Sequence, residues 1–263
     1  MKLNKIALAL SLAAFAMPLT ALAQDAAETT EATTEAAAQE AAPAAEAAAE
    51  EESSSNLSWN LSATSDYVFR GITQSNFKPA VQGGLDYAFG DTGWYVGAWA
   101  SNIDFNDSDG PDIELDTYVG YGTSLSDEWA VDVHAVQYTY IGEQNSYGNI
   151  DYSEFFVGTT FNDMLTLTLA YAPDYANADI SSTYLGVAGS WEVGSGVSLN
   201  AGVGHSKFSD DAGSYSDWNL GVSRSFGPVE AALTYYDTTG DYVDFLYDGK
   251  ASDQVVLSFK IGG

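Results

Sequence analysis

The chain has 263 residues, with 37 acidic against 8 basic side chains, so its formal net charge is −29 at pH 7. This charge excludes nucleic acid as a partner, because phosphate binding needs clustered positive charge. The lack of cysteine excludes disulfides, thiolate metal sites and cysteine nucleophiles. Only 17% of the residues are charged whereas 13% are aromatic, which is typical neither of a soluble domain nor of a disordered chain.

Residues 1–23 have the features of a secretory signal peptide. Two lysines precede an apolar run from Ile6 to Met17, and Ala21-Leu22-Ala23 matches the small-residue cleavage pattern. The run is too short for a transmembrane helix, which needs about 20 apolar residues. We therefore expect cleavage after this tripeptide and export across the inner membrane.

Residues 24–55 consist almost entirely of Ala, Glu, Thr and Ser. The segment has no aromatic and no large aliphatic side chain, so it cannot bury enough apolar surface to offset the entropy of ordering the chain. We expect a disordered acidic tether. It is either a solvated low-complexity linker or a periplasmic spacer that contacts the cell wall or a partner.

From residue 56 to residue 263, apolar residues recur at every second position, the pattern of strands with one apolar and one polar face. Leu57, Trp59 and Leu61, for example, alternate with polar residues. Only 94–105 is ambiguous, because both of its faces carry apolar side chains. The pattern predicts twelve strands, close to residues 57–64, 81–89, 94–105, 113–121, 129–135, 155–161, 165–171, 185–193, 197–203, 218–226, 229–235 and 255–261.

The connections between these strands alternate in length. Tight turns are expected at 90–93, 126–128, 162–164, 194–196 and 227–228. Longer polar loops are expected around 69–79, 106–112, 141–151, 172–181, 208–216 and 237–252. An even strand number with short turns at one end and long loops at the other is typical of an up-and-down transmembrane β-barrel, whose termini and short turns face the periplasm.

Aromatic residues near both ends of the strands favour the same architecture, because both membrane interfaces select aromatic side chains. Beside the short turns lie Phe89, Trp94, Trp129, Phe161, Trp191 and Phe226. Near the long loops lie Tyr67, Phe69, Tyr138, Tyr140, Tyr171, Tyr175, Tyr184 and Tyr215. A soluble β-sandwich also has alternating strands, but it would not sort aromatic residues to both strand ends.

Polar residues opposite the apolar set would face the lumen of this barrel. The lumen-lining candidates are Asp66, Asp86, Glu114, Asp116, Asp132, His134, Glu154, Glu192, Asp217, Glu230 and Lys260. Carboxylates there lower the electrostatic energy of cations and raise that of anions, which predicts a narrow, cation-preferring channel for small hydrophilic solutes. The alternative is a plugged interior in which the acids bond to one another and to the few bases.

Catalytic patterns are weak, and we expect no enzyme and no cofactor. His205 lies on the apolar face of its strand near a long loop, and Ser181 or Ser182 could lie on the preceding strand, as in a lipid hydrolase of the barrel wall. The sequence identifies no third group to orient the histidine, so an interfacial histidine is the plainer interpretation. No catalytic residue is therefore assigned.

No dedicated metal site is expected either. The acidic loop 104–110 lacks the Gly and the Glu that an EF-hand requires. Weak binding of divalent cations, of the kind that bridges lipopolysaccharide phosphates, stays open for the outer loops.

Several segments resemble the TorF family of porins, also called the Gcw_chp family. They are SATSDYVFRGITQS at 62–75, PAVQGGLDY at 79–87, GWYVGAWASNIDF at 93–105 and ELDTYVGY at 114–121. The resemblance covers 56–263 and implies a Gram-negative outer-membrane barrel whose porin function is assigned by inference, with no catalytic residues. Implied partners are outer-membrane lipid, lipopolysaccharide, the barrel-assembly machinery and small solutes. The acidic tether is extra material, and the chain ends on Gly263 rather than on an aromatic residue.

Arg70 stands in this motif at the top of the first strand, where the first long loop begins. One interpretation is that it pairs with lumen acids such as Asp66 or Asp116 and holds a loop across the mouth. The other is that it anchors the loop and has no part in transport. Neither the solute nor the oligomeric state follows from the sequence.

Overall fold

The computed structural model describes residues 56–106, 109–142, 148–210, 212–240 and 253–263. The expected signal peptide and acidic tether lie outside the described residues. The described helices are two single turns, η1 (Gly90–Thr92) and η2 (Tyr175–Asn177). None of the helices in this part of the chain is long and apolar enough to cross a membrane.

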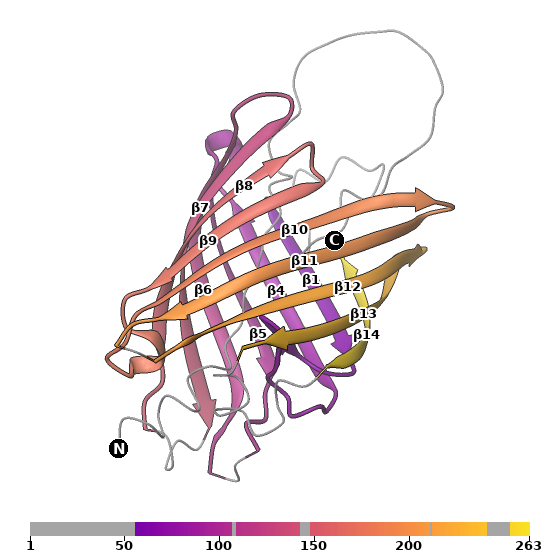
Figure 1. Cartoon of the computed structure of the whole chain (residues 1–263). Helices are drawn as coiled ribbons and strands as arrows, with labels where there is room; N and C mark the ends of the chain where they lie inside the picture. The colour runs from indigo at the N-terminus through magenta and orange to yellow at the C-terminus, as the bar shows by residue number, and fades with distance from the viewer. Residues whose placement is uncertain (1–55, 107–108, 143–147, 211, 241–252) are drawn as a thin grey trace, which may run out of the picture.

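Twelve antiparallel strands form one closed barrel, and this confirms the predicted fold class (Figure 1). The strands are β1 (Leu57–Thr64), β4 (Ala80–Ala88), β5 (Trp94–Asn102), β6 (Pro111–Ser124), β7 (Trp129–Gly142), β8 (Tyr152–Phe161), β9 (Leu165–Ala172), β10 (Ser182–Gly194), β11 (Val197–Phe208), β12 (Ser214–Phe226), β13 (Val229–Thr239) and β14 (Gln254–Gly262). Each pairs with the next barrel strand in the chain. The barrel closes between its first and last strands, where Leu61 is the partner of Ile261.

The predicted alternation sets the outer surface. Leu85, Val157, Leu167 and Leu220 are exposed on the outside of their strands, as expected for side chains that meet an apolar medium. In the ambiguous β5, Trp94 and Val96 face outward, whereas Trp99 is buried on the inside. Near the short turns, aromatic rings pack side by side on the outer surface: Trp129 lies 4.8 Å from Phe161.

The alternation changes phase near the long loops. In β7 the inward residues Val136, Tyr138 and Tyr140 are buried, while the outward Gln137 is polar and exposed. The strand continues to Gly142, well past the predicted end near residue 135, because an apolar interior at this end gives its inner face a core to pack against. The inner face of β7 is therefore apolar at the loop end, whereas it carries Asp132 and His134 nearer the short turn.

This phase change corrects one expectation about the aromatic residues. The row near the long loops was predicted to face the membrane interface. Of that row, Tyr67, Phe69, Tyr138, Tyr140, Tyr175 and Tyr215 are buried inside the barrel, Tyr184 packs against the same core, and only Tyr171 is exposed. The inward rings form a core because the loop segments that they contact also fold inward.

The first long loop is not an outer loop. Residues 65–75 fold into the barrel as an inner hairpin built on two short strands, β2 (Val68–Phe69) and β3 (Ile72–Thr73). Ile72 and Gln74 are completely buried. The two residues at its tip, Arg70 and Gly71, both have positive φ, which closes the two-residue turn between the short strands. The fold therefore brings a polar hairpin into the lumen.

Candidate functional site in the barrel interior

The base of the inner hairpin is held by its own acid. The Asp66 carboxylate accepts hydrogen bonds from Thr73 Oγ1 at 2.6 Å and from Ser75 Oγ at 2.7 Å. The backbone N–H of Gln74 donates to the carbonyl oxygen of Tyr67 at 2.6 Å. Burial raises the pKa of Asp66 above its ordinary value, and the hydrogen bonds from the two hydroxyls offset part of that increase.

One side of the inner hairpin is bonded to the wall at β6 and β7. The Tyr67 hydroxyl donates to Glu114 Oε1 at 2.8 Å, and the Tyr140 hydroxyl donates to Glu114 Oε2 at 3.1 Å. The Tyr67 ring also meets Trp99 edge to face, with centroids 5.4 Å apart. Glu114 is fully buried, so its two phenol donors replace the water that a carboxylate would otherwise need.

The tip of the hairpin is bonded to a different part of the wall. Arg70 Nη2 lies 3.1 Å and 3.2 Å from the two carboxylate oxygens of Glu154 on β8. The Arg70 guanidinium also lies over the ring of Tyr184 on β10, 4.1 Å from its centroid. A Cβ added to Gly71 would stand 2.3 Å from Thr238 Cγ2 and 3.0 Å from Asp217 Cβ. The tip therefore touches strands from β8 to β13.

This geometry corrects the expected partners of Arg70. The arginine does hold a loop across the interior, but its carboxylate partner is Glu154 and not Asp66 or Asp116. Asp66 is bonded within the hairpin instead. Asp116 is buried, and its Oδ1 has no hydrogen-bond partner. The sequence could not rank these acids, because all of them face inward and only strand closure decides which one the tip reaches.

A tyrosine hydroxyl contacts most of the other inward acids. Tyr95 donates to Asp132 at 2.8 Å, Tyr184 to Asp217 at 3.5 Å, Tyr138 to Glu154 at 3.3 Å and Tyr118 to Asp86. These tyrosines lie on strands beside or close to the acid that they contact. A phenol donates a hydrogen bond without supplying a positive charge, so these contacts do not pair the acids with a base.

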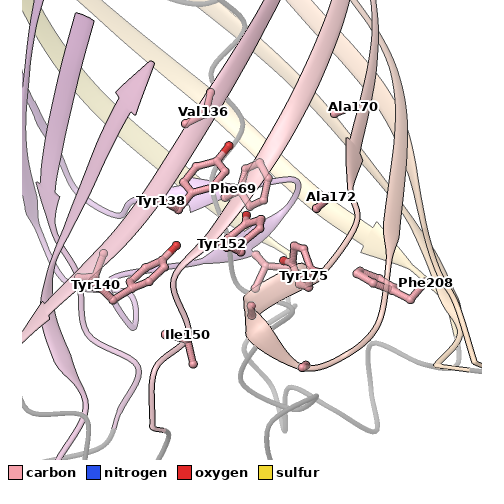
Figure 2. Packing of buried hydrophobic residues seen from close by; sticks show 14 of the residues in the cluster. Phe69, Val136, Tyr138, Tyr140, Ile150, Tyr152, Ala170, Ala172, Tyr175 and Phe208 are labelled. Carbon is pink, nitrogen blue, oxygen red and sulfur yellow. The ribbon is translucent and has the colours of Figure 1, made fainter. Parts of the chain in front are cut away.

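Aromatic rings make a continuous arc around the interior at the loop end. Tyr138 stacks on Tyr152 with centroids 4.6 Å apart, Tyr152 lies 5.0 Å from Tyr175, and Tyr175 lies 5.3 Å from Phe208. Figure 2 shows these rings with Phe69 of the inner hairpin among them. Tyr175 comes from η2, so a second loop also folds inward. The sequence contained the signal for this arc in the phase change of β7.

Comparison with known proteins assigns the family. The family model described as "Bacterial protein of unknown function (Gcw_chp)" matches residues 48–260. The chain is a member of the Gcw_chp family. That description names no function, so the porin activity associated with the name TorF stays a prediction. A search of curated proteins finds no match for the sequence.

Solved structures resemble this Gcw_chp protein in fold. The KdgM porin matches with a TM-score of 0.50 at 7% identity, over 78% of this chain and 97% of that one. The NanC porin matches with a TM-score of 0.47 at 13% identity, over 78% and 97% of the two chains. OprD from Pseudomonas aeruginosa has a TM-score of 0.35 at 13% identity, over 79% and 66%. At these identities the KdgM likeness shows the fold alone.

The remaining lumen candidates of the Gcw_chp chain are spread along the interior. His134 Nδ1 lies 2.5 Å from Asp132 Oδ1, and its ring stacks on Phe156 with centroids 4.5 Å apart. Nearer the short turns, the structure places Glu192, Glu230 and Lys260, all half-buried, with the last two as direct partners on β13 and β14. The described residues contain no group of three acids or histidines that could hold a metal ion.

Toward the short turns, small and polar side chains replace the aromatic rings in the interior of the Gcw_chp barrel. Inward positions there are mixed: Asn60, Asn219 and Glu192 are half-buried, whereas Ser190, Ser198 and Ser223 are buried. Except for Glu192, these side chains are neutral and polar. The lumen thus has an aromatic, packed loop half and a polar turn half.

The His205 geometry corrects the serines considered for a hydrolase. Ser182 is the partner of Phe208 on β11 and is buried on the inside, whereas His205 is exposed on the outside. His205 Nδ1 instead lies 2.9 Å from Ser216 Oγ on β12. Among the described residues no carboxylate pairs with this histidine. The contact lacks the orienting group that activates a serine.

Proposed function

We propose that this Gcw_chp protein is a passive channel of the Gram-negative outer membrane for small hydrophilic solutes, with a preference for cations. The excess of acid in its interior carries this proposal. Nine inward acids, Asp66, Asp86, Glu114, Asp116, Asp132, Glu154, Glu192, Asp217 and Glu230, face only two permanently charged bases, Arg70 and Lys260, among the described residues. Negative charge in a narrow lumen attracts cations and repels anions.

The division of the lumen supports the same proposal and adds a constriction. Solutes would enter the polar turn half freely and meet the inner hairpin in the loop half. Its two attachments are Tyr67 to Glu114 on β6 and Arg70 to Glu154 on β8. We expect the hairpin to set the conductance, because it occupies the space between β6 and β13 that the strands enclose.

The rest of the chain completes the proposal. Residues 1–23 would direct export, 24–55 would be an acidic tether on the periplasmic side, and 56–263 would be the barrel. Membrane insertion would need the barrel-assembly machinery and would bring the outer surface into contact with outer-membrane lipid and lipopolysaccharide. The exposed apolar band on the outer surface, with Leu85, Val157 and Leu220, fits such contacts.

A closed barrel without transport is the second candidate. The packing of the loop half favours it, since Tyr138, Tyr152, Tyr175 and Phe208 form a buried arc that the hairpin completes. In that case the protein would have a structural or adhesive role. The two candidates differ in whether ions cross the folded barrel.

Planar-bilayer recording distinguishes the candidates. Residues 24–263 would be folded, checked for β structure by circular dichroism, and inserted into a bilayer under a KCl gradient. The channel predicts current steps with a cation-selective reversal potential, and Asp132→Asn with Asp217→Asn should move that potential toward zero. Folded protein that inserts but carries no current would establish the closed barrel instead.

A further inference from the structure

The tip of the inner hairpin occupies a site with the chemistry of a cation receptor. We call Glu154, Tyr184 and Asp217 the Arg70 site. Glu154 supplies a buried carboxylate 3.1 Å from the guanidinium, and Tyr184 supplies a ring face 4.1 Å away. Asp217 accepts a hydrogen bond from the Tyr184 hydroxyl at 3.5 Å and interacts electrostatically with Arg70. Three strands of the wall thus converge on one guanidinium.

We propose that the Arg70 site is a recognition site for solutes that carry a guanidinium group, and that Arg70 occupies it when no solute is bound. The inference rests on the proposed channel function and names its solute class. A guanidinium is planar and weakly hydrated, presents N–H donors in a fork that matches a carboxylate, and stacks on aromatic rings. The site offers a carboxylate and a ring face to the same group.

Arg70 uses this site incompletely. Both of its hydrogen bonds to Glu154 come from the single atom Nη2, so the paired donors of the guanidinium fork are not both engaged. Its Nε and the Oδ2 of Asp217 are buried and have no hydrogen-bond partner. A buried polar atom without a partner is costly, so a free guanidinium compound that also donates to Asp217 Oδ2 would make a contact that Arg70 does not make.

The backbone explains why Arg70 cannot fill the site itself. Arg70 has φ of 43° in the left-handed region, and Gly71 after it has φ of 80°. A residue with a side chain is strained in the left-handed region. A Cβ on Gly71 would overlap Thr238 Cγ2, so the backbone of the tip already lies close to the wall and leaves little room for it to advance. A free guanidinium compound has no such tether.

Binding would also act on the constriction. A solute in the Arg70 site displaces the tip of the inner hairpin from β8 and β10. The base of the hairpin stays attached through the hydrogen bond from Tyr67 to Glu114. The solute that the site recognises would therefore loosen the tip that blocks its own path.

Vacating the site tests the proposal. Arg70→Ala in the purified protein in detergent leaves the site empty, and methylguanidinium chloride at millimolar concentration is the probe. We expect a saturable rise in melting temperature, half-maximal at a roughly tenfold lower concentration than with methylammonium, the ratio for one more charged hydrogen bond. Glu154→Gln in the same background should abolish the response.

Arg224→Ala is the matched control. Arg224 lies on the outer face of β12, with its guanidinium 5.3 Å from the Phe226 ring, so its removal creates no interior site. Equal responses to methylguanidinium in the two variants would overturn the proposal. If Arg70→Ala does not fold, Arg70→Lys keeps the charge without the planar fork. Methylguanidinium should displace that lysine and stabilise the variant, and the absence of any response would refute the proposal.

This measurement is independent of conduction. If the protein binds methylguanidinium but carries no current, the proposed recognition site is supported and the proposed channel function is refuted. If the protein carries current but its Arg70→Ala variant binds no methylguanidinium, the channel function is supported and the recognition site is refuted.

Discussion

Arg70 and Glu154 are 84 residues apart in the chain and form a buried ion pair with a separation of 3.1 Å. The pair joins the first loop to the middle of the barrel wall. Breaking a buried pair by removing one partner leaves the other charge uncompensated, at a cost of about 3–5 kcal/mol. The position of the inner hairpin therefore depends on this contact more than on any exposed one.

Removing the acid of the pair should release the hairpin tip. Because the chain has no cysteine, Ile72→Cys provides one buried reporter in the hairpin. With Glu154→Gln in that background, we expect maleimide labelling of the cysteine to become roughly tenfold faster or more, since the lost pair favours local opening. Asp86→Asn is the control, because this inward acid contacts Tyr118 and not the hairpin. Equal labelling rates in the two variants would show that the ion pair of Arg70 and Glu154 does not hold the hairpin tip.

Gly71 should tolerate no side chain. Gly71→Ala combines positive φ with a Cβ placed 2.3 Å from Thr238 Cγ2, whereas Gly90 has positive φ of 56° and no atom within 4 Å of an added Cβ. We expect Gly90→Ala to lower the free energy of unfolding by about 1 kcal/mol and Gly71→Ala by about 3 kcal/mol. Only the Gly71 variant should also raise the single-channel conductance. Urea unfolding measures the stability and bilayer recording measures the conductance. A similar loss of unfolding free energy in the two variants would show that the hairpin tip does not pack against Thr238.

The hydroxyl of Tyr67 should contribute to stability through Glu114. Tyr67→Phe removes one of the two phenol donors to the buried Glu114 carboxylate and leaves only that of Tyr140. We expect the free energy of unfolding to fall by about 1–3 kcal/mol. Tyr171→Phe on the outer surface should change the free energy of unfolding little, because its ring is exposed. Denaturant melts of the two variants compare the effects directly. An equal loss would mean that the bond from Tyr67 to Glu114 is not maintained.

Asp66 should make the protein less stable as the pH rises. Burial raises its pKa from 3.8, so the folded state binds a proton at this carboxyl more readily than the unfolded state does. Stability from this group is present below pH 3.8 and is lost as the pH rises to the folded pKa. Asp66→Asn removes the titration and keeps an oxygen acceptor for Thr73 and Ser75. The free energy of unfolding of the wild type minus that of the variant should fall as the pH rises above about 4; a rise would contradict the assignment.

The contact between His205 and Ser216 should not support hydrolysis. Although the two side chains lie 2.9 Å apart, the described residues supply no carboxylate to orient the histidine. We expect no fatty-acid release from phospholipid vesicles that contain the protein, with or without His205→Ala. Release that depends on both His205 and Ser216 would show that the barrel wall is an enzyme.

The sequence by itself determined the barrel. Alternating residues such as Leu165, Leu167 and Leu169 mark an outer face by local periodicity alone, and turn residues at 162–164 and 194–196 mark where strands reverse. Both signals depend on residues close in the chain. The strand number, the short turns and the inward position of acids such as Glu114 were therefore predictable from the sequence.

The tertiary structure alone decided what fills the lumen. Period two places Tyr138 on the same face as Asp132 and Tyr215 on the same face as Asp217, so the sequence indicated that they point inward, but not that an inward-folded loop would cover them. The pairing of Arg70 with Glu154 depended on which strands lie opposite each other once β1 meets β14. Several inward acids were equivalent along the chain, and closure of the sheet brought Glu154 and Asp217 to the hairpin tip.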